Sequence, residues 1–326
     1  SMKKAATYIS PIKLQINLTH EDLKTAGQYE IKAYNPPPGG GSSNKAILTI
    51  KPSLEITITS PQNNTTINKA KTIVKGTFKS ETRDIGITIN GILAEITGNE
   101  WIANNILLSI GANTITATIK DSEGNTETAT ITINTTDISQ PVTLSANITS
   151  GISPLQVFFS ASTSFTPVSY QMDFEGDEII DFIGTIFEDI THTYTQEGIF
   201  YPTITVTDEQ GNIYSDTIAI TVMNKAEIDT LLKGKWEGMK GAMSSGDVER
   251  AITYFISQYR DSFREAFTLM KDKISINLSL QDEINLIDIY DDIANYENIV
   301  YEPKGVYSYP VLFMKDEDGT WKIRSF

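Results

Sequence analysis

Residues 111–133 read GANTITATIKDSEGNTETATITI, two runs of alternating residues joined by the turn sequence DSEGN. Thr alternates with Ile or Ala on both sides of the turn, which is the two-residue period of a strand with one buried face. A similar hairpin, YPTITVTDEQGNIYSDTIAITV, follows at 201–222, and its turn DEQGN lies 87 residues after DSEGN. A shared hairpin at this spacing predicts tandem β-sandwiches rather than a solenoid of short repeats.

The sequence changes character at about residue 225. Before it, short runs rich in Thr, Ile, Asn and Ser are broken by Pro and Gly, as in strands with one exposed face. After it, Leu232, Trp236, Met239 and Met243 recur on one face of a helix, and alternating strands follow. The sequence therefore predicts a multidomain fold, with tandem all-β sandwiches followed by an α+β domain. We expect the domains to span 1–52, 53–137, 138–224 and 225–326.

Two resemblances to known families concern the first half of the chain. AGQYEIKAYNPPPGGGSSNKAILTI (26–50) resembles the last two strands of an IPT/TIG immunoglobulin-like domain. The first strands of that family have no counterpart here, so we expect a longer protein with further domains upstream. The run from ITSP (58–61) through ING (89–91) to DSEGN is similar to bacterial immunoglobulin-like modules such as the accessory domain of glucodextranase.

Two further resemblances concern the second half. YQMDFEG (170–176) with HTYTQEGIFYPTITVTDEQGN (192–212) resembles the polycystic kidney disease (PKD) repeat. The usual Asp-Phe-Gly-Asp-Gly of that repeat is DFEGDE here, so its turn departs from the family pattern. KWEGMKGAMSSGDVERAITYFISQYRDSFREAF (235–267) with DEDGTWKIRSF (316–326) looks like the nuclear transport factor 2-like fold, a cone of cystatin type. Relatives with that fold enclose a pocket, and some are enzymes.

The net charge of −15 is distributed unevenly. Residues 138–224 contain 11 acidic residues and no Lys or Arg, and five of these acids fall between Asp173 and Asp181. A chain of this kind does not hold nucleic acid by counterion release, so we expect no nucleic-acid partner. A divalent cation is the natural counterion of such a segment.

Four of these carboxylates are spaced as candidate calcium ligands. Asp173, Glu175, Asp177 and Asp181 occupy positions 1, 3, 5 and 9 of a loop, and alternate residues can aim oxygens at one cation. An EF-hand is excluded for two reasons. The glycine of this loop, Gly176, is at position 4 instead of 6, and position 12 is Gly184, which has no side chain to replace the usual bidentate Glu. Two interpretations stay open: a looser Ca²⁺ site, or an acidic hairpin with solvated carboxylates. We expect no cofactor other than this candidate Ca²⁺.

Catalytic patterns are scarce. The chain has no Cys and two His, and it contains neither Gly-x-Ser-x-Gly nor a phosphate-binding loop. Zinc sites, thiol chemistry and a serine triad are therefore disfavoured, and we expect no enzyme activity. The question stays open for residues 225–326 alone, because of the pocket that the resembled cone fold encloses.

Aromatic residues supply the candidate ligand contacts. Tyr259, Tyr296, Tyr307 and Tyr309 could line a pocket in the cone, unless aromatic side chains fill its interior as core. Trp101 is a candidate for stacking on a sugar ring, although alternation in GNEWIANN also suits a position inside the sandwich.

The sequence thus favours a non-catalytic, extracellular or cell-surface modular protein. No run of 18 apolar residues is present, and the first ten residues lack the apolar core of a signal peptide. The sandwiches would form an elongated stalk for adhesion, or bind carbohydrate or protein at the cell surface. Two alternatives remain: a C-terminal domain that binds or transforms a small ligand in its cone, or an accessory tail of an upstream polysaccharide-active enzyme.

Overall fold

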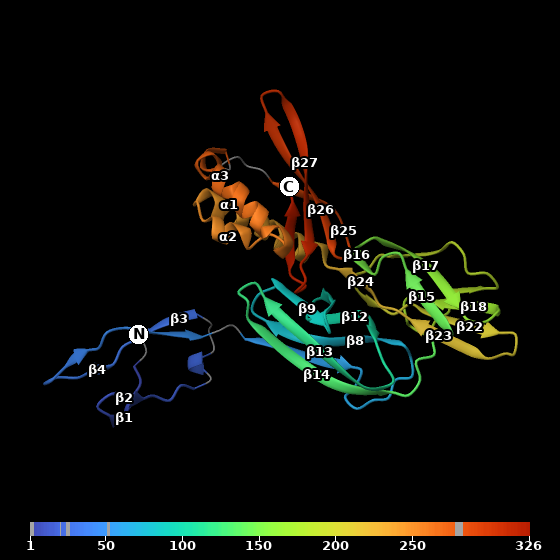
Figure 1. The fold of residues 1–326 in the computed structure, drawn as a ribbon, viewed down its shortest axis with the longest axis horizontal. Helices are drawn as coiled ribbons and strands as arrows, with labels where there is room; N and C mark the ends of the chain where they lie inside the picture. Colours follow the sequence, from blue (N-terminus) through green and yellow to red (C-terminus); the bar gives the residue numbers. More distant parts are fainter. Residues whose placement is uncertain (1–2, 20, 24–26, 51–52, 278–282) are drawn as a thin grey trace. The chain divides into compact units, whose positions relative to one another are not determined.

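The chain forms two compact units, Ser1–Leu54 and Glu55–Phe326. A computed structural model describes residues 3–19, 21–23, 27–50, 53–277 and 283–326 (Figure 1).

The first unit consists of short hairpins. The predicted strands on either side of the NPPPGGGSSN loop are observed as β3 (Gly27–Ile31) and β6 (Ala46–Ile50), which pair antiparallel. The remaining elements are β1 (Thr7–Ser10) paired with β2 (Lys13–Gln15), the 3-10 turn η1 (Glu21–Leu23), and β4 (Tyr34–Asn35) paired with β5 (Gly41–Ser42).

Two four-stranded sheets face each other in residues 54–135. Inward residues alternate along the strands, so Ile87, Ile115 and Val74 are fully buried between the sheets. One sheet has the order β11 (Glu95–Thr97), β12 (Glu100–Leu107), β8 (Lys71–Ser80), β7 (Leu54–Ser60). The other has the order β10 (Ile92–Leu93), β9 (Ile85–Ile89), β13 (Gly111–Asp121), β14 (Thr126–Thr135).

A second pair of sheets lies in residues 142–217. Met172, Val157 and Ile204 are fully buried at the centre of its core. The smaller sheet has the order β15 (Val142–Ala146), β17 (Leu155–Thr163), β20 (Ile190–Tyr194). The larger has the order β19 (Phe182–Gly184), β18 (Pro167–Asp173), β22 (Thr203–Asp208), β23 (Ile213–Thr217).

A seven-stranded sheet continues across the predicted boundary at residue 224. Gly151 pairs with Tyr290, which joins strands from before the boundary to strands from after it. The order is β21 (Gly198–Phe200), β24 (Ile220–Met223), β16 (Ser150–Ile152), β25 (Ile284–Tyr290), β26 (Ile293–Glu302), β27 (Gly305–Lys315), β28 (Trp321–Ser325).

Three helices cover one face of the C-terminal strands (Figure 1). The predicted apolar face is confirmed, because Leu232, Trp236, Met239 and Met243 are all buried. Asn224 caps the first helix by accepting a hydrogen bond from the Glu227 N–H at 2.8 Å. The helical elements are α1 (Lys225–Ser244), α2 (Val248–Ile252), the 3-10 turn η2 (Ser257–Tyr259) and α3 (Arg260–Asn277).

The two repeated turns have the same hydrogen bonds. Asp121 Oδ1 accepts from the backbone N–H groups of Glu123 (3.0 Å) and Asn125 (2.8 Å), and Asn125 Nδ2 donates to Asp121 Oδ2 at 2.8 Å. Asp208 accepts the equivalent three bonds at 2.9, 2.8 and 2.8 Å, the last two from Asn212. Both aspartates are buried, so each turn satisfies the carboxylate locally. The two similar sequences, DSEGN and DEQGN, therefore form the same hydrogen-bonded turn.

Candidate functional site

The acidic stretch forms the loop between β18 and β19. Asp173, at the end of β18, is buried and accepts four backbone hydrogen bonds. They come from the N–H groups of Glu175 (3.1 Å), Gly176 (2.7 Å), Asp177 (3.4 Å) and Glu178 (2.8 Å). The carboxylate of Asp173 therefore organises the loop around itself.

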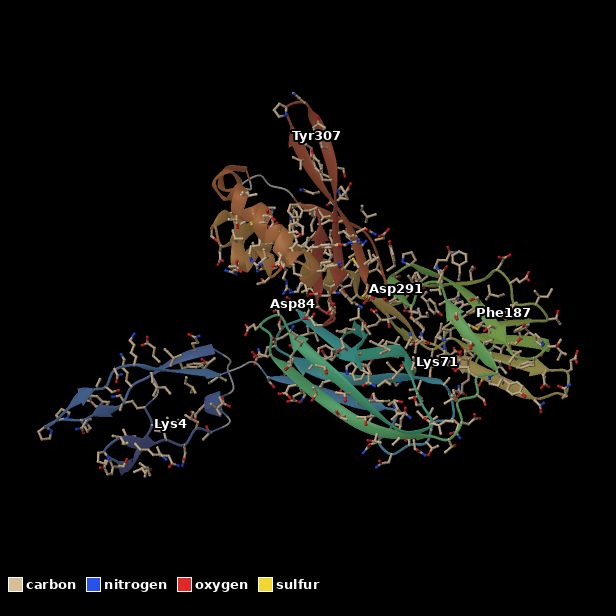
Figure 2. The ribbon with its side chains drawn as sticks, in the orientation of Figure 1. Lys4, Lys71, Asp84, Phe187, Asp291 and Tyr307 are labelled. Carbon is tan, nitrogen blue, oxygen red and sulfur yellow. The ribbon has the colours of Figure 1, made fainter. Side chains whose placement is uncertain are left out.

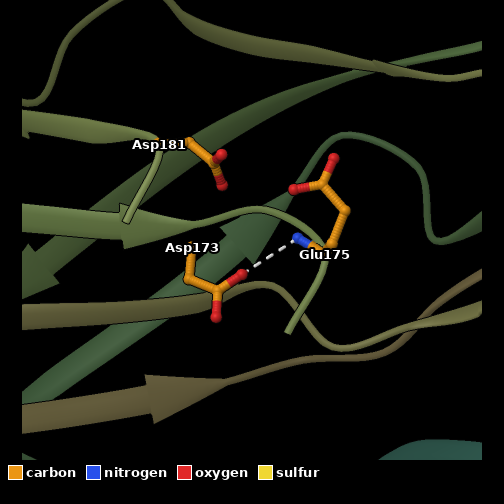
Figure 3. Close-up of side chains that lie close together, drawn as sticks. All are labelled: Asp173, Glu175 and Asp181. Carbon is orange, nitrogen blue, oxygen red and sulfur yellow. Dashed lines mark hydrogen bonds between the residues drawn. The ribbon is translucent and has the colours of Figure 1, made fainter. Parts of the chain in front are cut away.

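Three of the four predicted calcium ligands lie together (Figure 3). Asp173, Glu175 and Asp181 each present an oxygen within 4.8 Å of the others. Asp177 lies outside this group, and its Oδ1 accepts the Ile179 N–H at 2.9 Å. Three carboxylates are hard oxygen ligands of the type that Ca²⁺ takes. However, the N–H groups around Asp173 already offset part of the negative charge that a cation would neutralise.

Protonation is a second way to relieve repulsion in this cluster. Burial, followed by the charges of Asp181, Asp177 and Asp173, raises the pKa of Glu175 to about 7. His192 Nε2 lies 2.9 Å from Glu175 Oε1, and burial lowers the pKa of His192. A proton bound by Glu175 at neutral pH therefore competes with any cation for the carboxylate oxygens of the cluster.

Two of the predicted ligand contacts are core residues, so these predictions are wrong. The Trp101 ring is fully buried, and its indole N–H donates to the Thr77 carbonyl at 3.3 Å. A Cβ added at Gly76 would lie 2.4 Å from the Trp101 ring, so the glycine makes the space for it. Tyr296 is also buried, and its hydroxyl donates to Asp229 Oδ1 at 2.9 Å. The Trp101 ring is therefore inaccessible to a sugar, and the Tyr296 ring is part of the core instead of lining an open pocket.

Tyr307 and Tyr309 lie side by side on β27. They are 39% and 46% exposed, and their rings stack with centroids 6.4 Å apart at 29°. Residues two apart on a strand share a face, so the pair forms one aromatic platform. Figure 2 labels Tyr307 on the hairpin of β26 and β27. Tyr259 lies in η2 and is half-buried, on a different element from this pair.

Aromatic core fills the space between helices and sheet in the described part of residues 225–326. Phe255 and Phe313 are fully buried there, and Trp236, Phe267 and Trp321 pack with them. A cavity of about 80 Å³ lies elsewhere, between α1 and the first sandwich, where Leu231, Glu95 and Lys315 are among its lining residues. This packing agrees with the filled-core interpretation of the C-terminal domain.

Ion pairs with buried lysines join the first sandwich to the C-terminal domain. Lys315 Nζ lies 2.7 Å from Glu95 Oε1 and 3.3 Å from Asp292 Oδ1. Burial raises the pKa of Glu95, whereas the two carboxylates outweigh the effect of burial and raise that of Lys315. Lys235 Nζ lies 2.5 Å from Asp84 Oδ1. We call these ion pairs between the first sandwich and the C-terminal domain the buried seam. Glu95 and Lys315 are 220 residues apart, so no local sequence pattern could have indicated that they meet.

Hydrogen bonds join the first sandwich to the acidic segment, residues 138–224. The Asn104 side chain forms two hydrogen bonds with the backbone of Ala219, at 2.8 and 2.9 Å. Lys75 Nζ donates to the Tyr201 hydroxyl at 3.0 Å, and Lys69 Nζ donates to the Ser215 carbonyl at 3.4 Å. Lysines of the first sandwich therefore contact residues 138–224, the segment that contains no Lys or Arg.

Sequence comparison finds a family for the first sandwich. Residues 54–136 match the family model of glucodextranase, domain B. No curated protein matches the chain. In the described residues, no helix is long and apolar enough to cross a membrane.

Solved structures of modular proteins resemble parts of the chain at low identity. Fibronectin(III)-like modules of Clostridium thermocellum CbhA share 14% identity, with coverage of 52% of this chain and 94% of theirs and a TM-score of 0.21. The BIgI domain of S. agalactiae beta protein, solved bound to CEACAM1, shares 23% identity, with coverage of 27% and 100% and a TM-score of 0.19. Bacteroides ovatus SGBP-B, solved with a mixed-linkage heptasaccharide, shares 13% identity, with coverage of 60% and 53% and a TM-score of 0.15. The family match therefore concerns residues 54–136 alone: the first sandwich is similar in sequence to glucodextranase, domain B.

Proposed function

We propose that this chain is a non-catalytic, extracellular modular protein that binds carbohydrate or protein at a cell surface. The match of residues 54–136 to glucodextranase domain B carries the proposal. The packed core of the C-terminal domain supports it, because a binding surface on strands and loops requires no enclosed pocket.

The tyrosine pair of β27 is the candidate carbohydrate contact. Tyr307 and Tyr309 present two stacked rings on one face of an exposed hairpin. Aromatic faces bind the apolar faces of sugar rings, and Tyr loses little conformational entropy on binding. Val306 and Tyr301, on the opposite face of the hairpin, are 62% and 77% exposed. The hairpin thus offers aromatic and apolar surface on both faces.

A glycan array probed with the full chain tests this proposal. We expect binding to one glycan class, and loss of that binding in the double variant Tyr307→Ala/Tyr309→Ala. Tyr34→Ala is the matched control, because Tyr34 is 59% exposed on a different element. Absence of binding to glycans and to immobilised surface proteins would refute the proposed function, whereas an unchanged double variant would refute the tyrosine platform alone.

The second candidate is an accessory role for a polysaccharide-active enzyme. The family matched by the first sandwich takes its name from an enzyme, glucodextranase. Affinity electrophoresis in gels that contain dextran or mixed-linkage β-glucan tests this accessory role. Retardation in dextran supports the accessory role, and unretarded migration in both polysaccharides contradicts it.

A further inference from the structure

Four isoleucines near β19 face solvent. Ile179, Ile180, Ile183 and Ile186 are 63%, 43%, 70% and 65% exposed, and we call them the isoleucine patch. Single exposed apolar residues are ordinary, but a contiguous group with a polar rim marks an interaction surface. The patch belongs to none of the candidate sites described above.

The loop that carries the patch is held by hydrogen bonds. Asp173 fixes the backbone from Glu175 to Glu178, and Asp177 accepts the Ile179 N–H. Glu178 adopts a φ of +70°, a conformation that L residues seldom take without such support. The acidic stretch therefore organises the loop that presents Ile179 and Ile180 to solvent.

Aromatic anchors lie under the second half of the patch. Phe182 and Phe187 contact each other with ring centroids 5.9 Å apart and pack against the core of the second sandwich. Figure 2 labels Phe187 in this sandwich. Ile183 and Ile186, which alternate with these anchors, remain exposed. The patch is therefore a fixed feature of a packed element.

The patch also coincides with an open sheet edge. β19 is the last strand of its sheet, and in the described part of the chain it pairs only with β18. An edge strand presents unpaired N–H and C=O groups to which an extended segment can add. Residues 182–186 read FIGTI and contain no Lys or Pro, the residues that commonly protect such edges.

The charge around the patch selects among partners. The exposed carboxylates of Asp177, Glu178, Asp181, Glu188 and Asp189 surround it in sequence, in a segment without Lys or Arg. A second copy of this chain or an anionic membrane would bring like charges together. A basic partner gains attraction as well as apolar contact.

Two lysines of the first sandwich already contact neutral groups of residues 138–224. Lys75 lies on β8 and Lys69 just precedes that strand; together they contact Tyr201 and Ser215 of the acidic segment. The Lys75 ammonium also lies 4.6 Å from the centroid of the Tyr201 ring. From the edge, the patch and the charge together, we infer that β19 binds an extended, basic polypeptide segment in which apolar and basic residues alternate. This inference rests on the proposed binding function and names a partner class for it.

Fluorescence anisotropy with a synthetic peptide tests the inference. The probe is a nonapeptide that alternates Lys with Val, added to the full chain; the controls are the Glu–Val peptide and a Lys/Val peptide with blocked order. We expect the alternating Lys–Val peptide to bind, and Ile183→Gln/Ile186→Gln to weaken binding at least tenfold without any change of charge. Ile213→Gln is the matched control, because Ile213 is 68% exposed on β23, the opposite edge of the same sheet. It should bind as the unmodified chain does.

Four results would overturn the inference: no binding of the Lys–Val peptide, equal binding of the blocked-order peptide, equal loss in Ile213→Gln, or concentration-dependent dimers that Ile183→Gln dissolves. The last result would make a second copy the occupant. Glycan or surface-protein binding that survives Ile183→Gln/Ile186→Gln, in a chain that ignores the peptide, would overturn this inference and leave the proposed function standing.

Discussion

The two sandwiches of residues 55–326 share a turn but differ in how they treat charge. Both hairpins close on a buried aspartate with the same three hydrogen bonds. The first sandwich places Glu95 and Asp84 opposite buried lysines of the C-terminal domain. The second has no basic residue and uses Asp173 to bind its own backbone, with acids left at the surface. Beyond the shared turn, the first sandwich thus uses carboxylates for domain docking, and the second uses one to build a further loop.

Breaking the buried seam should have the largest effect. Lys315→Met leaves Glu95 buried without its cation, and we expect a loss of about 3 kcal/mol in the free energy of unfolding. Replacing both partners, as Glu95→Leu/Lys315→Met, should recover most of it. Lys79→Met is the control, because the Lys79–Glu55 pair is exposed and contributes under ~1 kcal/mol. Urea unfolding measures all three; equal losses in Lys315→Met and Lys79→Met would contradict the importance of the seam.

The shared turn should give matched losses in the two sandwiches. Asp121→Ala and Asp208→Ala each remove the three shared hydrogen bonds from a buried position, and we expect each to cost about 2 kcal/mol. Asp137→Ala removes two hydrogen bonds that Ser139 donates in an exposed turn and should cost well under half of that, about 0.5 kcal/mol. Thermal unfolding of the full chain measures the difference. A large loss at only one of the two turns would show that the repeat is not a shared folding element.

Calcium should stabilise the second sandwich and not the first. If Asp173, Glu175 and Asp181 bind Ca²⁺, a concentration ten times Kd adds about 1.4 kcal/mol. The gain should be larger at pH 8 than at pH 6, because a proton on Glu175 competes with the cation. Melting with Ca²⁺ and with chelator measures this, and Asp181→Asn should abolish it. An identical midpoint in both buffers at pH 8 would remove calcium from the proposal.

The contribution of the second sandwich to the pH dependence of stability should be the smallest effect. The pKa of Glu175 rises from 4.5 in the unfolded chain to about 7, so the folded state binds the extra proton between these values. The contribution of Glu175 to stability is therefore full below about pH 4.5 and is lost as the pH rises to about 7. Because its side chain is 35% exposed, we expect only about 1 kcal/mol. Unfolding at pH 5 and pH 8 measures it; Glu175→Gln should flatten the difference, and Glu188→Gln should not.

Local chemistry made a large part of the fold predictable. The alternation of strands, the DSEGN and DEQGN turns and the apolar face of α1 are all determined by neighbours within a few residues. Gly246, two residues after the end of α1, adopts a φ of +74°, a conformation that favours glycine. The loop carboxylates could be found for the same reason, because Asp173, Glu175 and Asp181 are close in sequence.

Burial was less predictable, because a strand pattern does not say which face is covered. Trp101 and Tyr296 are core residues, whereas Tyr307 and Tyr309 on a neighbouring strand to Tyr296 are exposed. Ile183 and Ile186 belong to a residue type that is usually buried, yet they face solvent at a sheet edge. Period-2 alternation shows that successive side chains of a strand point to opposite faces of the sheet. Which of the two faces is buried depends on the elements that pack against that sheet.

The sequence by itself determined the strands, turns and helices, the segregation of charge, and the match of residues 54–136 to a family model. The tertiary structure decided which charges meet, since Lys315 and Glu95 are brought together across 220 residues. It also decided that one sheet runs across residue 224, through the pairing of Gly151 with Tyr290. The physical reason is range: propensity and turn chemistry act over a few residues, whereas burial and ion pairing depend on surfaces that exist only once distant segments have packed.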